Sequence, residues 1–435
     1  MAADPSKPGL RAALDGWLAR LRAWPSRRIA DPDFRRWAER HWLTRPVARR
    51  QAKALFDLVA GFVYSQVLLA CVQLQLFERL AAGPASLDDL AQALGLPPER
   101  ARCLLNAAVA LRLLASPAPG SYALGTLGAA MVGNDGVIAM VKHHPALYAD
   151  LRDPVALLRG ESTSDALAQF WPYASAHADG AATAAGDAAA VAAYSTLMTA
   201  SQPLLADLVL DACPLERHRC LLDVGGGEAA FLIAAGQRHP HLQLRLFDLP
   251  GVAERAHRRL AAFGMTARSA CTAGDFFRDP LPTGADAVSL VRVVHDHDDT
   301  AVQRLLRAVH AALPPGGTLL LAEPMAGTAQ APAMGDAYFG WYLLAMGSGR
   351  PRTAAELSAL LRGAGFVDIL AGLDEAGLAQ HVARSGIGQQ SPRAQRPIAR
   401  YPRCRDDRLG RLGGIAMAPI GLAQPVAEFG QLIGQ

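Results

Sequence analysis

The block Arg292-Val-Val-His295-Asp296-His297-Asp298-Asp299 holds the residues best suited to acid–base chemistry. An imidazole titrates near neutral pH, so His295 is a candidate general base if it ends a strand beside a ligand. Asp296 would then either orient His295 or cap the following helix. A metal site of His295, His297 and Asp299 is disfavoured, because the Asp-Asp pair indicates a helix start, and alternating side chains share a face only in a strand.

A second stretch, Leu221-Leu-Asp223-Val-Gly225-Gly226-Gly227, indicates a strand and a glycine turn, followed by a helix up to Gln237. Glycine accepts positive φ and lets a ligand approach the backbone closely. The free N–H groups at the helix start favour an anionic part of the ligand. The spacing Gly225-x-Gly227-x-x-Ala230 also fits the dinucleotide fingerprint. The turn therefore predicts a nucleotide-like ligand without specifying which one.

Three acids narrow the choice of ligand. Asp248 follows the glycines at the distance where an acid accepts hydrogen bonds from ribose hydroxyls. Asp275 and Phe276 could hold an adenine, the carboxylate accepting from its amino group and the ring packing on its face. Asp223, just before the turn, can engage an amino-acid ammonium. Nothing downstream suits hydride transfer, and no lysine or metal cluster suits phosphoryl transfer, so these features together indicate S-adenosylmethionine (SAM).

Alternating strands and helices must position these side chains. Strands are predicted at 220–224, 242–247, 266–271, 286–294 and 318–323, and helices at 228–237, 252–263 and 299–313. This repetition predicts an α/β protein with a Rossmann-like, doubly wound parallel sheet. Ligands of such sheets bind at the carboxyl ends of the strands. The candidate residues follow strand ends, so we expect them to meet at one edge of the sheet.

The front part of the chain is predicted to be mostly helical. The apolar pattern at 51–82 is interrupted by Asp57 and three glutamines, which favours a helix buried on most sides, as at a subunit interface, over a membrane span. Residues 86–114 have a helix-turn-helix pattern, with Ser86 and Asp89 at the capping-box spacing and a wing near Tyr122. The second helix lacks a basic recognition face, which argues against DNA binding. A non-catalytic SAM- or DNA-binding regulator is nevertheless an alternative function.

Residues 1–50 are basic and aromatic. They hold eleven Arg and one Lys against five acids, and four of the six Trp. Two interpretations stay open: an arm that packs on a partner subunit, and an element that lies peripherally on anionic lipid. The whole chain carries only +4, so the remainder is slightly acidic, which argues against nucleic acid as a partner.

The cysteines and the apolar runs indicate a cytoplasmic protein. The six Cys show no CxxC pairing, as expected of reduced thiols. The N-terminus shows no apolar h-region of a secretory signal, and no uninterrupted apolar run approaches the ~20 residues of a membrane span. If residues 1–50 bind lipid, the protein would be peripheral on the inner face of a membrane.

Several blocks in fixed order resemble the class I methyltransferases of the caffeate and acetylserotonin O-methyltransferase type. They are Leu222-Asp-Val-Gly-Gly-Gly227, Phe247-Asp-Leu-Pro250, Gly274-Asp-Phe-Phe277, Arg292-Val-Val-His-Asp296, Pro315-Gly-Gly-Thr318 and Ala364-Gly-Phe366. The front half is similar to the family's winged-helix dimerisation domain, which does not bind DNA there. The stretches Ala54–Cys71 and His143–Gly160 are most similar to the bacterial carotenoid branch.

The resemblance implies a homodimeric, SAM-dependent O-methyltransferase with a hydrophobic acceptor, first of all a hydroxycarotenoid. A phenol, a polyketide or a tetrapyrrole carbon are alternative acceptors. By resemblance, His295 takes the substrate proton, and the cofactor is bound by Gly225, Gly226, Gly227, Asp248, Asp275, Phe276 and Arg292. No metal is implied.

Two departures from the family pattern concern the base. Many members have Trp where this chain has His297. Plant members carry a second carboxylate within Gly-Lys-Glu-Arg-Thr, and here Gly349-Arg-Pro-Arg-Thr353 puts Pro351 at that place. Glu323, at the next strand end, is then the remaining candidate to orient His295.

The predicted domain organisation has four parts. These are a basic, Trp-rich arm at 1–50, a dimerisation domain at 51–185, a SAM-binding domain at 186–384 and a disordered tail at 385–435. The family's sheet ends in two strands, which a changed reading frame near residue 370 would leave incomplete. Tyr338–Met346 suits either the wall of an acceptor site or a core helix. His143 and His144 suit either a polar helix face or a pocket wall.

Overall fold

The computed structural model of the 435-residue chain describes residues 26–170, 205–211, 213, 215–328, 333–373 and 378–385. The chain divides into two compact units, residues 1–70 and 71–435. The predictions for residues 1–25, for the domain boundary between residues 185 and 186, and for a disordered tail after residue 385 lie outside the described residues.

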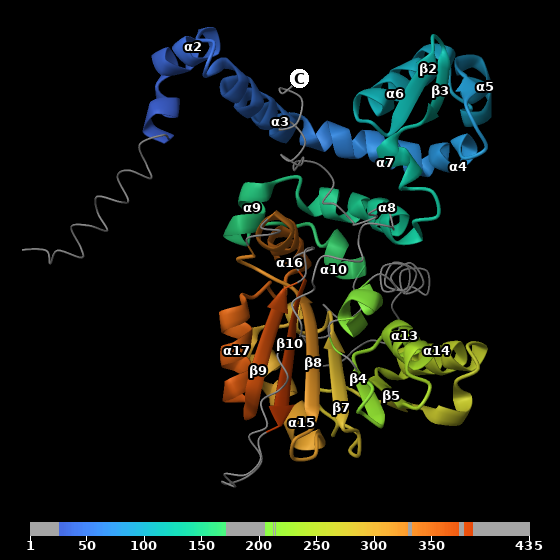
Figure 1. Cartoon of the computed structure of the whole chain (residues 1–435), viewed down its shortest axis with the longest axis vertical. Helices are drawn as coiled ribbons and strands as arrows, with labels where there is room; N and C mark the ends of the chain where they lie inside the picture. The colour runs from blue at the N-terminus through green and yellow to red at the C-terminus, as the bar shows by residue number, and fades with distance from the viewer. Residues whose placement is uncertain are drawn as a thin grey trace, which may run out of the picture. The chain divides into compact units, whose positions relative to one another are not determined.

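The first unit contains α2 (Pro32–Arg40) and most of α3 (Arg45–Gln73) (Figure 1). Among the described helices, α3 alone is long and apolar enough to cross a membrane. Its apolar side chains are largely exposed in the single chain, for example Leu55 at 64% and Phe62 at 70%. The prediction that this helix is buried on most sides is therefore wrong for one chain. An exposed apolar face of this size is typical of an interaction surface.

The second unit begins with the predicted helix-turn-helix and its wing. Its helices are α4 (Leu76–Leu80), α5 (Leu87–Leu94), α6 (Pro98–Ala110) and α7 (Thr126–Ala129), with strands β1 (Ala85–Ser86), β2 (Leu114–Ala118) and β3 (Ser121–Leu124) in the order β1-β3-β2. Ser86 caps α5 by accepting the N–H of Asp89 at 3.1 Å. Gly95 ends α5 with φ +63°, the left-handed conformation that glycine adopts at helix ends.

Three helices follow, α8 (Asp135–Asp150), α9 (Pro154–Arg159) and α10 (Ala166–Phe170). This part of the front half, predicted to be mostly helical, is therefore interrupted after Asp150 and again after Arg159. The buried Asp150 carboxylate explains part of the break, since it accepts the N–H groups of Ala166 and Leu167 at 3.0 and 2.8 Å and so holds the start of α10.

A seven-stranded sheet forms the rest of the unit, in the order β6-β5-β4-β7-β8-β10-β9 (Figure 1). Its strands are β4 (Cys220–Val224), β5 (Gln243–Asp248), β6 (Ser269–Ala273), β7 (Ala287–Val291), β8 (Thr318–Pro324), β9 (Phe366–Leu373) and β10 (Leu378–Ser385). The helices are α13 (Ala230–Arg238), α14 (Pro250–Ala262), α15 (Asp299–Ala312), α16 (Gly340–Met346) and α17 (Ala354–Gly363), with the 3-10 turns η1 (Thr266–Arg268) and η2 (Val294–Asp296) and the π-helical η3 (Ala333–Phe339).

Helices cover both faces of this sheet, as the doubly wound prediction requires. Side chains alternate along each strand, so that Leu222 and Val288 pack with α15 and α17, whereas Leu221 and Ala287 pack with α13 and α14. The strands β6, β5, β4, β7 and β8 are parallel. The predicted Rossmann-like α/β fold is confirmed, in a sheet that is mixed because β10 is antiparallel to its neighbours.

The last two strands complete the sheet. The strand β10 pairs with β8 from Leu378 opposite Pro324 to Arg384 opposite Thr318, and with β9 on its other side. The expectation that a changed reading frame leaves these strands incomplete is therefore wrong.

Candidate active site

The glycine turn follows β4 as predicted. Gly225 and Gly227 have φ of +68° and +58°, where a side chain would be strained. A Cβ on Gly226 would lie 2.3 Å from the Asp223 carboxylate, and one on Gly225 would lie 3.0 Å from Val293 and 3.6 Å from Phe276. The turn therefore lies against the β7 loop and against the end of β6, which brings three predicted motifs together.

Asp223 is buried beneath this turn. One of its oxygens accepts the Ser289 hydroxyl at 2.6 Å. Its other oxygen, Oδ2, has no hydrogen-bonding partner among the described residues. Burial raises the pKa of Asp223 to about 7. An unpartnered buried carboxylate oxygen beside glycine backbone fits the ammonium of an amino-acid moiety, which would favour the charged form.

Asp248 ends β5 and faces the same turn. Its carboxylate accepts the N–H of Gly227 at 2.9 Å and of Leu249 at 2.7 Å. Burial nevertheless raises the pKa of Asp248 to about 6. An acid that bridges the second strand and the glycine turn lies where ribose hydroxyls bind in sheets of this kind.

Asp275 and Phe276 follow β6. Asp275 accepts the N–H of Phe277 at 2.9 Å and lies 3.4 Å from Arg278, so its carboxylate has local partners in addition to the predicted ligand. Gly274 is required here, since a Cβ would lie 2.5 Å from the Phe247 ring.

The predicted strand 286–294 ends earlier, at Val291. Arg292 has φ +58°, an uncommon conformation for a residue with a side chain and a frequent one at functional sites. Its N–H donates to Ala322 at 2.8 Å. The chain then enters η2, so His295 lies on a 3-10 turn and not on a strand end as predicted.

His295 is buried between two carboxylates. Its Nδ1 lies 2.6 Å from Glu323 Oε2, and its Nε2 lies 3.0 Å from Asp296 Oδ1. Burial lowers the pKa of the imidazole, but the charges of Asp296 and Glu323 outweigh it, and the pKa is raised above its usual value. Asp296 therefore lies beside the ring, and the cap of α15 is Asp298, which accepts the N–H of Ala301 at 2.8 Å.

Glu323 holds the whole turn as well as the ring. Its Oε1 accepts the N–H groups of Val293 and Val294 at 2.9 and 2.6 Å, and its Oε2 lies 3.4 Å from the N–H of His295. One buried carboxylate thus fixes both the backbone and the imidazole orientation, which fits the predicted orienting residue.

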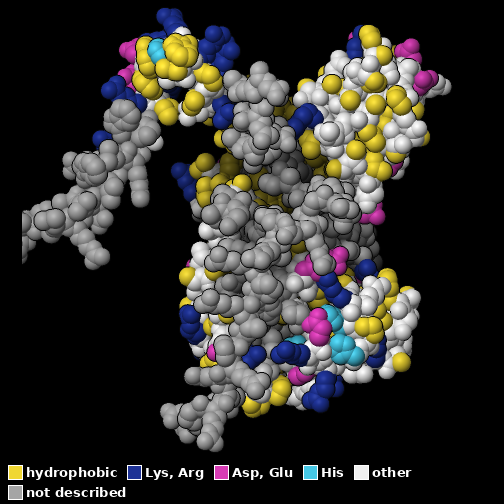
Figure 2. Space-filling view, in the orientation of Figure 1, with side chains coloured by type: hydrophobic (Ala, Val, Ile, Leu, Met, Phe, Trp, Pro, Cys, Tyr) yellow, Lys and Arg dark blue, Asp and Glu magenta, His cyan; other side chains and the backbone are white. Residues whose placement is uncertain are grey.

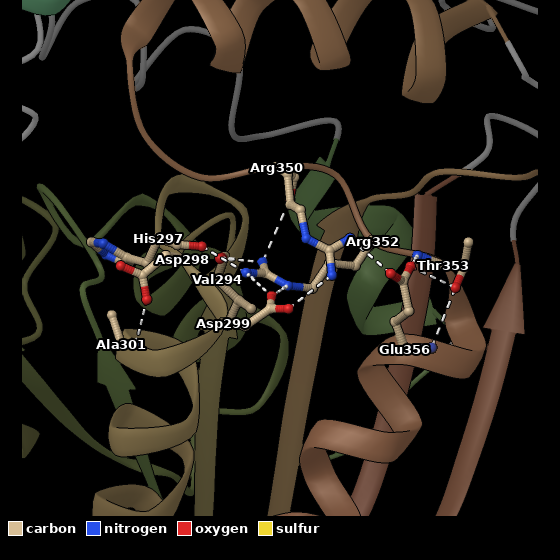
Figure 3. A network of polar contacts seen from close by, with 9 residues as sticks. All are labelled: Val294, His297, Asp298, Asp299, Ala301, Arg350, Arg352, Thr353 and Glu356. Carbon is tan, nitrogen blue, oxygen red and sulfur yellow. Dashed lines mark hydrogen bonds and ion pairs between the residues drawn. The ribbon is translucent and has the colours of Figure 1, made fainter.

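A second set of contacts holds the carbonyl side of the same turn (Figure 3). The buried Arg352 donates to the carbonyl oxygens of Val294 and His297 at 2.9 and 2.6 Å. The N–H of Arg350 donates to His295 O at 2.9 Å, and Ser348 Oγ donates to Asp296 O at 2.9 Å. Four consecutive carbonyls, those of residues 294–297, are therefore bound by the loop 348–352, which we call the carbonyl clamp.

Ion pairs and one glycine fix the carbonyl clamp. Asp299 binds both Arg350 and Arg352, and Glu356 binds Arg350 at 2.8 Å (Figure 3). Gly349 passes so close that a Cβ there would lie 2.0 Å from the carbonyl oxygen of His295. The clamp is formed by the stretch in which the family resemblance implied a missing second carboxylate. From the sequence Gly349-Arg-Pro-Arg-Thr353 we predicted the loss of a carboxylate at Pro351. We did not predict the contacts that Arg350 and Arg352 make.

The aromatic segment 338–346 has two parts. Tyr342, Leu343 and Met346 pack in a core with α8, α9 and α10, so the core-helix interpretation is right for that part. Phe339 instead lies edge-on to His295, with ring centroids 6.1 Å apart.

The paired histidines of α8 bind this segment. His143 Nε2 lies 2.7 Å from the Tyr342 hydroxyl, and His144 Nε2 lies 3.0 Å from the Tyr338 hydroxyl. Burial lowers the pKa of His143 to about 4, so the polar-face interpretation is wrong for it.

His297 lies edge-on to Phe276 and Phe277, with ring centroids 5.6 and 5.0 Å away. In the described parts of the chain, no three His, Cys, Asp or Glu side chains are grouped so that they could hold a metal ion. Asp299 binds arginines instead.

The fold and the glycine turn are those of a Rossmann-like protein with a nucleotide-like ligand, and the family models specify a methyltransferase. The O-methyltransferase domain matches residues 148–367, and the O-methyltransferase dimerisation domain matches residues 56–134. The demethylspheroidene O-methyltransferase of Cereibacter sphaeroides is 48% identical over 332 residues, 76% of this chain and 86% of that protein. Its namesake in Rhodobacter capsulatus is 43% identical over 331 residues, 76% of this chain and 81% of that protein.

Among solved structures, human N-acetylserotonin methyltransferase in complex with SAM has a TM-score of 0.62 and 24% identity, over 78% of this chain and 98% of that one. The chain belongs to the SAM-dependent O-methyltransferase family, and SAM is its cofactor. Its dimerisation domain suggests a homodimer.

Proposed function

We propose that the chain methylates the hydroxyl group of a hydroxycarotenoid of the demethylspheroidene type, with His295 as general base. The acceptor class rests on the names of the two relatives, which are 48% and 43% identical to this chain. The base rests on one observation, the buried imidazole held at 2.6 Å by Glu323 beside the glycine turn.

The cofactor residues follow from the contacts around the glycine turn. Asp223 Oδ2 would accept the ammonium of SAM, Gly225, Gly226 and Gly227 would let it approach the backbone, and Asp248 would accept ribose hydroxyls. Asp275 and Phe276 would hold the adenine. Arg292 directly precedes the turn that carries the base, and the family resemblance assigns it to the cofactor.

When bound, SAM supplies a methyl group activated by a sulfonium. His295 Nε2 would accept the hydroxyl proton while Glu323 keeps the ring oriented through Nδ1. An alkyl alcohol is a far weaker acid than an imidazolium of pKa ~6.5, so the proton leaves in concert with methyl transfer. Positioning in dry surroundings is then worth about 7–11 kcal/mol, which the fixed turn of residues 293–297 would supply.

The aromatic side chains near the base suit a lipophilic acceptor. Phe339 packs on His295, and Tyr338 continues the row with its ring centroid 5.3 Å from that of Phe339. Burial raises the pKa of Tyr338 to about 12, so its hydroxyl stays neutral and adds no charge to an apolar acceptor site.

Turnover of labelled SAM over a panel of hydroxycarotenoids, phenols, polyketides and tetrapyrroles tests the acceptor. We expect methyl transfer to a hydroxycarotenoid, and exclusive labelling of a phenol would refute this. His295→Ala should keep SAM affinity in calorimetry and lose most turnover. Turnover close to that of the unsubstituted protein would remove His295 as the base.

A further inference from the structure

Residues 26–50 form an exposed basic surface, which we call the arm surface. It comprises α2 and the first turns of α3, and it precedes the dimerisation match that starts at residue 56. Eight arginines and three acids lie in it, and all eight arginines are exposed: Arg27, Arg28, Arg35, Arg36, Arg40, Arg45, Arg49 and Arg50. Of the acids, Asp33 binds Arg36 and Asp31 caps α2, so a large positive excess remains.

The same surface exposes large aromatic and aliphatic side chains. Trp42 is 75% and Trp37 is 49% exposed, and Leu43 and Val47 are exposed as well. Trp37 stacks on His41, with ring centroids 4.8 Å apart. Because these apolar side chains are exposed, packing within the first unit does not account for their presence on this surface.

The two kinds of side chain lie next to each other on α2. Arg36 and Arg40 are four residues apart, as are Trp37 and His41, so each pair forms a row along the helix and the rows are adjacent. In Figure 2 the hydrophobic side chains of α2 lie together, and dark-blue arginines border them. Tryptophan and arginine in this arrangement match the interfacial layer of a bilayer, where indole rings lie at headgroup level and cations meet anionic lipid.

We propose that the arm surface docks the protein peripherally on an anionic lipid membrane. Charge complementarity selects this partner over a second copy of the chain. Contact of this patch with the same patch of a second copy would oppose like charges, which is unfavourable. Residues 51–435 offer little opposite charge, about −3, since the whole chain carries +4 and residues 1–50 carry +7. The surface also lies outside both family matches.

Docking at a bilayer would give the enzyme access to a water-insoluble acceptor. This consequence rests on the proposed function, whereas lipid binding itself does not. The two are separated experimentally, because binding to vesicles is measured without any acceptor or SAM.

Co-sedimentation of the full chain with vesicles tests the proposal. We expect binding to phosphatidylcholine vesicles that contain phosphatidylglycerol, weak binding to phosphatidylcholine alone, and loss of binding in high salt. Arg36→Gln with Arg40→Gln should weaken the binding about 30-fold, at about five-fold for each arginine. Trp42→Ser should weaken it further. The matched control is Arg100→Gln with Arg102→Gln on α6, which removes two exposed arginines elsewhere and should change nothing.

Three results would overturn lipid docking. The first is equal binding to both kinds of vesicle, or binding that the arm variants leave unchanged. The second is loss of the dimer mass in Arg36→Gln/Arg40→Gln by light scattering, which would assign the surface to a partner subunit. The third is tighter binding to single-stranded RNA than to anionic vesicles. Turnover with detergent-dispersed hydroxycarotenoid should be the same in the variants and the parent, and its absence in both would count against the proposed function alone.

Discussion

Arg352→Met tests whether the carbonyl clamp positions the catalytic turn. The substitution keeps an apolar stem and removes the donors to the carbonyl oxygens of Val294 and His297, at 2.9 and 2.6 Å. Each buried carbonyl that loses its donor costs about 1–3 kcal/mol, so the free energy of unfolding should fall by about 2–6 kcal/mol. The half-exposed Asp299 keeps Arg350 as a partner, so its contribution is small.

The catalytic effect should exceed what lost stability explains. Once its carbonyls are released, the turn that carries His295 can move, and a displacement of about 1 Å costs on the order of 100-fold in rate. We expect kcat to fall on the order of 10- to 100-fold, measured well below the unfolding temperature. The affinity for SAM, measured by calorimetry, should be almost unchanged, because the glycine turn and Asp248 do not contact Arg352.

Arg350→Met is the matched control. Its side chain binds Asp299 and Glu356 at the surface, but its contact with the His295 carbonyl is made by the backbone N–H, which the substitution retains. We expect a loss of about 0–1 kcal/mol and nearly normal kcat. Equal kcat losses in the two variants, or normal kcat in a folded Arg352→Met protein, would refute the positioning role of Arg352.

Three further predictions concern the groups around the turn. Glu323→Gln removes a charge that raises the pKa of His295. Since the base acts in its neutral form, the acid limb of the kcat/KM–pH profile should move to lower pH. An unchanged acid limb would contradict the pairing of Glu323 with His295. Burial raises the pKa of Asp223 from 3.8 to about 7, so in the cofactor-free protein its contribution to stability is full at low pH and is lost as the pH rises from about 4 to about 7. Over the same pH range the affinity for SAM should rise, because the charged carboxylate binds the ammonium. In Asp223→Asn the affinity measured by calorimetry should not change with pH. Gly349→Ala places a Cβ 2.0 Å from the His295 carbonyl oxygen at φ +76°, so it should lower both the unfolding temperature and kcat, whereas Gly347→Ala, with open space around its Cβ, should retain kcat.

The sequence predicts those parts of the site that are local. Glycines before a helix and acids after strands are determined by neighbouring residues, so the turn at Gly225 and the acids Asp223 and Asp248 could be assigned before any coordinates. Glu323 could be selected as a strand-end acid facing the next strand. Its binding of three backbone N–H groups could not, because those contacts join residues about thirty apart.

The carbonyl clamp and the end of β7 were beyond sequence reasoning for the same reason. Nothing near Arg292 indicates its positive φ, which shortens the predicted strand. Arginine is usually exposed, so the burial of Arg352, at 2% exposure, follows only from the carbonyls of Val294 and His297, to which its side chain donates. The apolar periodicity of α3 predicted burial, but it does not distinguish burial within a chain from burial between chains, so the exposure of this face in the single chain was not predicted.

The carbonyl clamp is continuous in sequence with the aromatic segment that packs beside His295. Residues 333–346 carry Phe339, and the next residues, 348–352, bind the turn on which His295 lies. The aromatic residues proposed to contact the acceptor and the clamp residues that fix the base therefore lie in one continuous stretch of sequence. If residues 333–353 are exchanged as a block with those of a relative, acceptor preference should be transferred and activity retained. If residues 333–346 alone are exchanged, the new aromatic residues should fit poorly beside the original clamp and base, and activity should fall.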